Sequence, residues 1–159
     1  MIMNTLDGSI LLVDDEKHFV ESAQLYLKTE GVHDVICCTN SMDVKKILSA
    51  NTVGLVVLDI MMPGISGVDL LKYIQSEYPD ILVIMVTAVN DIEMAVSCVK
   101  SGAYDYLQKP ITPDSLAATL DKAIEYSNLR RQTNNLKANL LKSKTVFHPA
   151  FDEIITCTD

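Results

Sequence analysis

The chain has 159 residues, 48% of them hydrophobic and 21% charged, which is typical of a globular protein of about one domain. The formal net charge of −8 argues against direct nucleic-acid binding by this chain, because such binding needs a basic face. No apolar run has the length of a membrane span, so we expect no membrane partner. The amino terminus lacks a signal peptide's basic start and the four cysteines form no CxxC pair, so we expect a cytoplasmic location and reduced thiols.

The first third of the chain alternates between strand and helix patterns. Residues 10–13 form a continuous apolar run, which predicts a strand buried on both faces. Residues 16–30 carry apolar side chains at helical spacing, and residues 32–38 predict a second, more exposed strand. The pair Asn40-Ser41 should cap the next helix, which places Met42 on that helix's apolar face.

The rest of the chain continues this alternation. Strands are expected at residues 54–58, 81–86 and 103–107, with helices at residues 66–78, from Asp91 to Gly102, and from Pro113 onward. Five strand–helix repeats are typical of an α/β protein with a doubly wound parallel sheet of flavodoxin-like order 2-1-3-4-5. The acidic residues Asp14, Asp15 and Glu16 follow the first strand, where a dinucleotide-binding fold needs a glycine-rich turn, so that fold is excluded.

The pattern changes after Ala123. Apolar or small side chains recur at alternating spacings of three and four residues, at Tyr126, Leu129, Thr133, Leu136, Leu140 and Phe147. This heptad-like spacing predicts a linker helix over residues 127–145 that forms a coiled coil with a second copy, although a single solvated helix fits the same pattern. We place the main domain at residues 8–126 and the start of a following domain at residues 146–159.

Polar side chains stand at four of the predicted strand ends. They are Asp14 and Asp15, Asp59, Thr87 and Lys109. These ends should meet at one edge of a doubly wound sheet, which is where ligands bind in such folds. Two carboxylates about 4 Å apart repel by several kcal/mol at an effective dielectric near 20, so the cluster needs positive charge beyond that of Lys109. Mg²⁺ fits this oxygen-rich set, whereas Zn²⁺ would need nearby His or Cys ligands.

A carboxylate, a divalent cation, a hydroxyl and an ammonium group are the parts that phosphoryl transfer to an aspartate requires. Asp59 would attack phosphorus, while the cation and Lys109 neutralise the phosphoryl oxygens and Thr87 donates its hydroxyl to one of them. Taken one at a time, these residues could also be a helix cap, a strand-end residue and a surface ion pair. All four strand ends together favour the chemical interpretation.

The chain resembles the receiver domain of bacterial two-component response regulators over about residues 9–126. The motifs that carry the resemblance are residues 11–16 (LLVDDE), 58–67 (LDIMMPGISG), 86–88 (VTA) and 102–110 (GAYDYLQKP). The resemblance implies that Asp59 is the phosphoacceptor for a sensor histidine kinase. It also implies that Asp14 or Asp15, together with Asp59 and the carbonyl of Met61, ligates Mg²⁺.

The resemblance implies three further features of the site. Thr87 and Lys109 hold the phosphoryl group, the Lys109–Pro110 bond is cis, and Tyr106 moves inward when Thr87 moves. Residues 147–155 (FHPAFDEII) resemble the entry to the AAA+ domain of regulators that activate σ54 transcription. The sequence given contains neither an ATPase phosphate loop nor a DNA-binding domain, so we expect those functions elsewhere.

Other functions of the same topology fit less well. An aspartyl-phosphate phosphatase would need an acid two residues after the nucleophile, where this chain has Met61. A flavin-binding module would need a phosphate loop where Asp14 and Asp15 would repel phosphate. The alternative that stays open is a receiver-like module that binds a partner without control by phosphorylation.

Overall fold

The computed structural model describes residues 6–88 and 92–147, with side chains up to Lys142. Its elements in chain order are β1 (Ser9–Val13), α1 (Lys17–Thr29), β2 (Val35–Cys38), the 3₁₀ turn η1 (Ser41–Asp43), α2 (Val44–Ala50), β3 (Val53–Asp59), α3 (Gly67–Glu77), β4 (Leu82–Thr87), α4 (Ile92–Lys100), β5 (Asp105–Gln108) and α5 (Pro113–Phe147). This is the predicted alternation of strands and helices.

The five strands form one parallel sheet of order β2-β1-β3-β4-β5, which confirms the predicted topology. Strands β1, β3 and β4 lie inside the sheet, and every residue of β1 and β4 is buried. Their near-continuous Val, Ile and Leu content is explained by burial on both faces, because alternation with polar residues occurs only where one face meets solvent.

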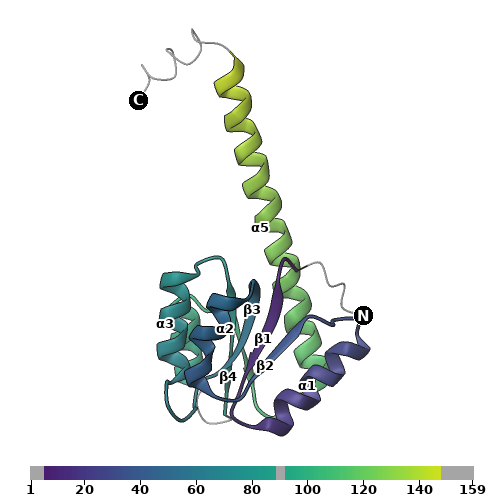
Figure 1. The fold of residues 1–159 in the computed structure, drawn as a ribbon, viewed down its shortest axis with the longest axis vertical. Coiled ribbons are helices and arrows are strands. Elements are labelled where there is room, and N and C mark those ends of the chain that lie inside the picture. The colour runs from purple at the N-terminus through teal and green to yellow at the C-terminus, as the bar shows by residue number, and fades with distance from the viewer. Residues whose placement is uncertain (1–5, 89–91, 148–159) are drawn as a thin grey trace. The chain divides into compact units, whose positions relative to one another are not determined.

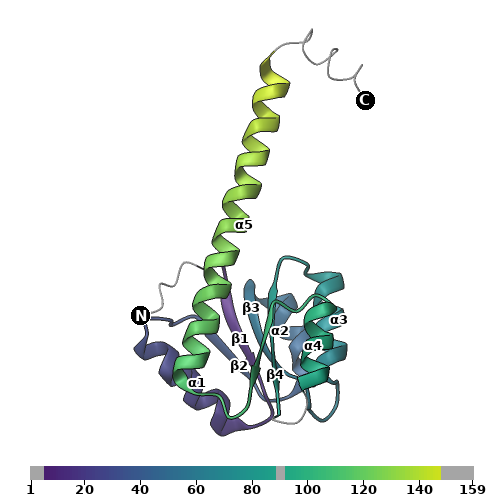
Figure 2. The same ribbon diagram turned by 180° about the vertical axis from the view of Figure 1, so that it is seen from behind.

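Helices cover both faces of the sheet, as the two opposite views in Figures 1 and 2 show. One core cluster joins the sheet to α1 and to the first turns of α5, through residues such as Leu27, Leu55 and Leu120. The other cluster joins the opposite face to α2, α3 and α4, through residues such as Leu71 and Met85. Two cores of this kind hold the strand ends rigidly, which fixes the positions of the side chains that follow them.

The segment after β2 differs from the prediction. Asn40 acts as a cap, since its side chain accepts a hydrogen bond from the Met42 amide, but it caps the 3₁₀ turn η1 and not α2. The prediction that Met42 lies on a buried helix face is wrong, because Met42 is 61% exposed while Ser41 is 2% exposed. A 3₁₀ turn has three residues per turn, so it rotates the buried position to Ser41.

Smaller boundary differences have local causes. The second strand begins at Val35, later than the predicted residue 32, because Gly31 adopts φ +89° and turns the chain there. Val32 is nevertheless fully buried. The Lys109–Pro110 bond is cis. The predicted helix start at Asp91 lies outside the described residues.

The chain divides into two compact units, residues 1–124 and residues 125–159. The described part of the second unit is the continuation of α5 to Phe147. Its apolar side chains Leu129, Leu136, Leu140 and Leu141 are each more than half exposed. Within the described residues, no helix combines the length and the apolar character that crossing a membrane would require.

Candidate functional site

The candidate site lies at the carboxyl edge of the sheet. Asp14 follows β1, Asp59 ends β3, Thr87 ends β4 and Lys109 follows β5. Backbone hydrogen bonds hold these ends in register, since the Lys109 amide donates to the Thr87 carbonyl at 2.8 Å and the Ile60 amide donates to the Val86 carbonyl at 2.9 Å. The convergence expected from the sequence is therefore present in the structure.

Three carboxylates gather at this edge. Oxygen atoms of Asp14, Asp15 and Asp59 all lie within 4.8 Å of one another. Asp14 and Asp59 are buried, with 1% and 6% of their surface exposed, while Asp15 is exposed. Among the described residues, this is the one group of three or more acidic, His or Cys side chains able to hold a metal ion.

Lys109 provides the positive charge in contact with this cluster. Its Nζ lies 2.9 Å from Asp14 Oδ2, 3.6 Å from Asp59 Oδ2 and 3.1 Å from Glu16 Oε1. Burial disfavours the charged amine, but the contact with Asp14 and the charges of Asp14 and Asp59 outweigh it and raise the pKa of Lys109. Lys109 is therefore a permanent cation in the site.

Glu16 was not predicted to take part in the site. Its sequence position directly after Asp14 and Asp15 was the available signal, but contact with Lys109 depends on side-chain reach across 93 residues of sequence. Phe19, one turn further along α1, adds a cation–π contact, with its ring centre 5.6 Å from Lys109 Nζ. The start of α1 thus holds the lysine from one side and Asp14 holds it from another.

Asp59 has a strongly perturbed acidity. Burial and the repulsion of Asp14 raise its pKa to about 6, against the opposing effects of Lys109 and of the Met61 amide, which donates to Asp59 Oδ1 at 3.3 Å. The protein therefore holds a carboxylate where negative charge is unfavourable. A bound cation would relieve this repulsion and favour the ionised, nucleophilic form.

Asp14 provides an independent observation on whether a cation fits. Its Oδ1 accepts a hydrogen bond from the Glu16 amide at 2.9 Å, whereas its buried Oδ2 lies 2.9 Å from the Lys109 ammonium, which donates a charge-assisted hydrogen bond to it. Buried carboxylate oxygens are normally hydrogen-bonded or bound to a metal. Because a carboxylate oxygen has two lone pairs, Oδ2 can bind a hard divalent cation in addition to Lys109, beside the two other carboxylates.

The two predicted switch residues lie on adjacent strands. Thr87 is 1% exposed and its hydroxyl donates to the Ala88 carbonyl at 3.3 Å. Tyr106 is half-buried on β5, opposite Met85 of β4, and packs against the core that α2, α3 and α4 share with the sheet. Tyr106 is therefore neither fully inside nor fully outside in this structure.

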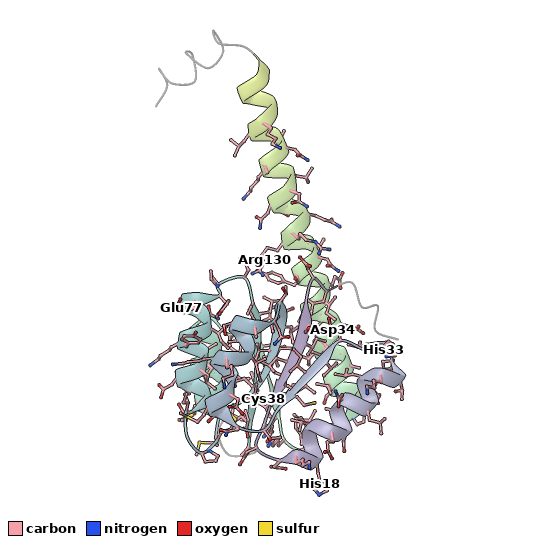
Figure 3. The ribbon with its side chains drawn as sticks, viewed as in Figure 1. His18, His33, Asp34, Cys38, Glu77 and Arg130 are labelled. Carbon is pink, nitrogen blue, oxygen red and sulfur yellow. The ribbon has the colours of Figure 1, made fainter. Side chains whose placement is uncertain are left out.

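His18 and His33 are the two histidines that the structure describes. Figure 3 shows His18 and His33 far from each other, near opposite ends of α1. His148 lies outside the described residues. Neither described histidine belongs to the carboxylate group, so the ligands available in the described site are oxygen atoms.

Comparison with known proteins gives one consistent result. The sequence pattern of the response regulator receiver domain matches residues 10–121. The chain is 38% identical over 141 residues to an NtrX-like response regulator of Rickettsia conorii, covering 87% of this chain and 29% of the relative. It is 33% identical over 138 residues to the DNA-binding transcriptional regulator NtrC of Proteus hauseri, covering 86% and 28%. The chain thus spans less than a third of these curated relatives.

A solved structure is similar over the main unit. The crystal structure of the receiver domain of NtrX from Brucella abortus superposes with a TM-score of 0.70 at 32% sequence identity. The match covers 74% of this chain and 98% of that one. The similarity therefore includes a whole receiver domain.

Proposed function

The chain belongs to the response regulator receiver family, of the NtrC and NtrX type, and from this premise we propose that Asp59 accepts a phosphoryl group from a sensor histidine kinase. A receiver is a regulatory domain, and its general function is to act as a phosphorylation switch in a two-component system. The observation that carries the proposal is the buried Asp59 with its raised pKa, in contact with Lys109 and beside Asp14 and Asp15.

The proposed chemistry assigns one role to each side chain. An oxygen of Asp59 forms the new bond to phosphorus as the bond to the donor's leaving group breaks. Lys109 neutralises a phosphoryl oxygen, and the Thr87 hydroxyl donates a hydrogen bond to another. Asp14, Asp15, Asp59 and the Met61 carbonyl would hold Mg²⁺, which receiver domains bind at an acidic pocket and which supplies further neutralising charge.

The switch would act through α4 and β5. A phosphoryl group adds about −1.5 to −2 charge units and three acceptor oxygens. Movement of Thr87 toward the phosphoryl group would favour an inward position of the Tyr106 side chain. If α4 and β5 already exchange between two arrangements, a difference of a few kcal/mol in contact energy is enough to shift the equilibrium from one to the other. Support comes from α4, where Ile92, Val96 and Val99 are partly exposed and available to change partners. In a longer protein this face would control a transcription-activating output domain in the cytoplasm.

Acetyl phosphate provides the direct test of this proposal. Wild-type protein incubated with acetyl phosphate and Mg²⁺ is expected to gain the mass of one phosphoryl group, and chelation of the metal should prevent the gain. Beryllofluoride should bind under the same metal requirement. Protein that stays unmodified and fails to bind beryllofluoride would instead favour a partner-binding module that phosphorylation does not control.

We also propose that the second unit forms a homodimer through the exposed side of α5. Leu129, Leu136 and Leu140 follow the heptad spacing and are 55%, 63% and 62% exposed, while Leu141 is equally exposed but lies off that line. A lone helix with this apolar line exposed would gain stability by burying it against a second copy.

Leu136→Asp should therefore convert the dimer to a monomer, as measured by sedimentation equilibrium. The dimer would bury the new carboxylate without a counter-charge, which is unfavourable. The matched control Leu141→Asp changes a leucine of 67% exposure on the same helix and should leave the dimer intact. A wild-type protein with monomer mass, or equal loss in both variants, would contradict the coiled coil.

A further inference from the structure

Ser41 is a buried polar residue in the turn after β2, and the functions proposed above leave it without a role. It is 2% exposed. Its hydroxyl donates to the Pro63 carbonyl at 2.7 Å and accepts from the Ile65 amide at 3.0 Å. One side chain therefore bridges both sides of the turn at Gly64, more than twenty residues away in sequence.

Gly64 fits this bridge closely. It adopts φ +87°, a conformation that favours glycine, and a Cβ built on it would lie 2.8 Å from Ser41 Oγ. No larger residue can stand at this turn unless the Ser41 contact shifts. The serine and the glycine thus form one tightly fitted contact between the loops that follow β2 and β3.

The turn that carries Ser41 is itself firmly held. Asn40 accepts the Met42 amide with its side chain at 3.0 Å and the Asp43 amide with its carbonyl at 3.0 Å, and the Cys38 thiol donates to that same carbonyl at 3.0 Å. The Cys38 carbonyl accepts the Asp14 amide at 3.1 Å. Residues 38–41 therefore contact both the backbone of Asp14 and the loop beyond Asp59.

The loop that Ser41 holds is the one that carries Met61. The Gly67 amide donates to the Ile60 carbonyl at 2.9 Å and closes the loop at its base, while Ser41 fixes its far side at Pro63 and Ile65. Between these two anchors the Met61 amide reaches Asp59 Oδ1. Displacement of the far side would displace the Met61 peptide relative to the acceptor carboxylate.

We infer that Ser41 is a positioning residue for the acceptor site: its hydroxyl fixes the loop of residues 60–65 so that the Met61 backbone faces Asp59, and it thereby strengthens divalent-cation binding. The inference rests on the proposed function, because the cation site is part of that function. Mutation of a residue that orients metal ligands without binding the metal itself commonly lowers the metal affinity by about 10–100-fold.

The test uses the full chain with Ser41→Ala and measures Mg²⁺ affinity by amide NMR shifts during an Mg²⁺ titration. We expect the Kd for Mg²⁺ to rise about tenfold, at the lower end of the range for residues outside the ligand set. Exchange of the Ile65 amide proton should accelerate, since that amide loses its acceptor. Ser41→Cys keeps a weaker hydrogen-bonding group on a somewhat larger atom, and it should give an intermediate Kd.

Ser9→Ala is the matched control. Ser9 is also a buried serine, at 8% exposure, and its hydroxyl donates to Asp34 Oδ1 at 2.7 Å, but it lies at the start of β1, at the other edge of the sheet. Ser9→Ala should lower the thermal midpoint and leave the Kd for Mg²⁺ unchanged. A loss of affinity equal to that of Ser41→Ala would reduce the Ser41 effect to general destabilisation and overturn the inference.

Gly64→Ala perturbs the contact between Ser41 and Gly64 through the glycine. It therefore tests the inference even if Ser41→Ala does not fold. It should also weaken Mg²⁺ binding, and the double variant should lose less affinity than the sum of the two single changes. Wild-type affinity in a folded Ser41→Ala or Gly64→Ala variant would overturn this inference alone. A wild-type protein that shows no response to Mg²⁺ would overturn the proposed cation site as well.

Discussion

Lys109→Met is expected to lower the free energy of unfolding of the metal-free protein by about 2–3 kcal/mol at neutral pH. Removal of one partner of a buried ion pair typically costs about 3–5 kcal/mol, and the 24% exposure of the Lys109 side chain reduces that figure. The cost arises because Asp14 and Asp59 then stay buried beside each other without a counter-charge. Urea denaturation followed by circular dichroism measures it.

The effect of Lys109→Met should depend on pH in one direction. Lys109 lowers the pKa of Asp59, so its loss raises that pKa further above the present value of about 6. The destabilisation is therefore present at pH values above this pKa and fades as the pH falls and Asp59 takes up a proton. Lys17→Met is the control, because Lys17 and its partner Glu21 are 77% and 57% exposed and 3.8 Å apart, and it should change stability by less than about 0.5 kcal/mol. Equal losses in the two variants would contradict the account.

Asp59→Asn is expected to stabilise the metal-free protein by about 1–2 kcal/mol at neutral pH. The pKa of Asp59 is raised from 3.8 to about 6 on folding, so the folded protein binds a proton more tightly than the unfolded chain does. Wild-type stability consequently falls as the pH rises from about 4 through about 6, and the asparagine variant does not show this fall. The ion pair with Lys109 that is lost reduces the net gain.

The same substitution should abolish phosphorylation by acetyl phosphate, because an amide cannot act as the acceptor. Gain of stability with loss of modification is the pattern of a residue retained for function. Asp121→Asn, an exposed position in α5, should leave both properties unchanged. Retained phosphorylation in Asp59→Asn would move the acceptor to another residue, and lower stability at neutral pH would contradict the raised pKa.

The fold could be predicted from sequence to the level of strand order. Buried strands such as β4 are uninterrupted apolar runs, here residues 81–86 between Asp80 and the polar Thr87, so their type and approximate limits are encoded locally. Met42 could not be placed in the same way. The choice between a 3₁₀ turn and the first turn of an α-helix depends on the tertiary hydrogen bonds of Ser41, which the local pattern does not contain.

The residues of the site also differ in whether the sequence alone could predict them. Asp14, Asp59, Thr87 and Lys109 were predictable because parallel topology forces the ends of adjacent strands together. Glu16 and Ser41 were not, since their contacts are made by side chains that reach across loops. Strand-end residues are thus accessible to sequence reasoning, whereas the residues that support them from neighbouring loops need coordinates.

The central claim is that this geometry makes a single aspartate the phosphoryl acceptor. Borohydride reduction of the phosphorylated protein converts an acyl phosphate on aspartate into homoserine, which peptide mass spectrometry locates. The account predicts homoserine at Asp59 and unchanged Asp14 and Asp15. Homoserine at either of those two neighbours, with Asp59 intact, would contradict it.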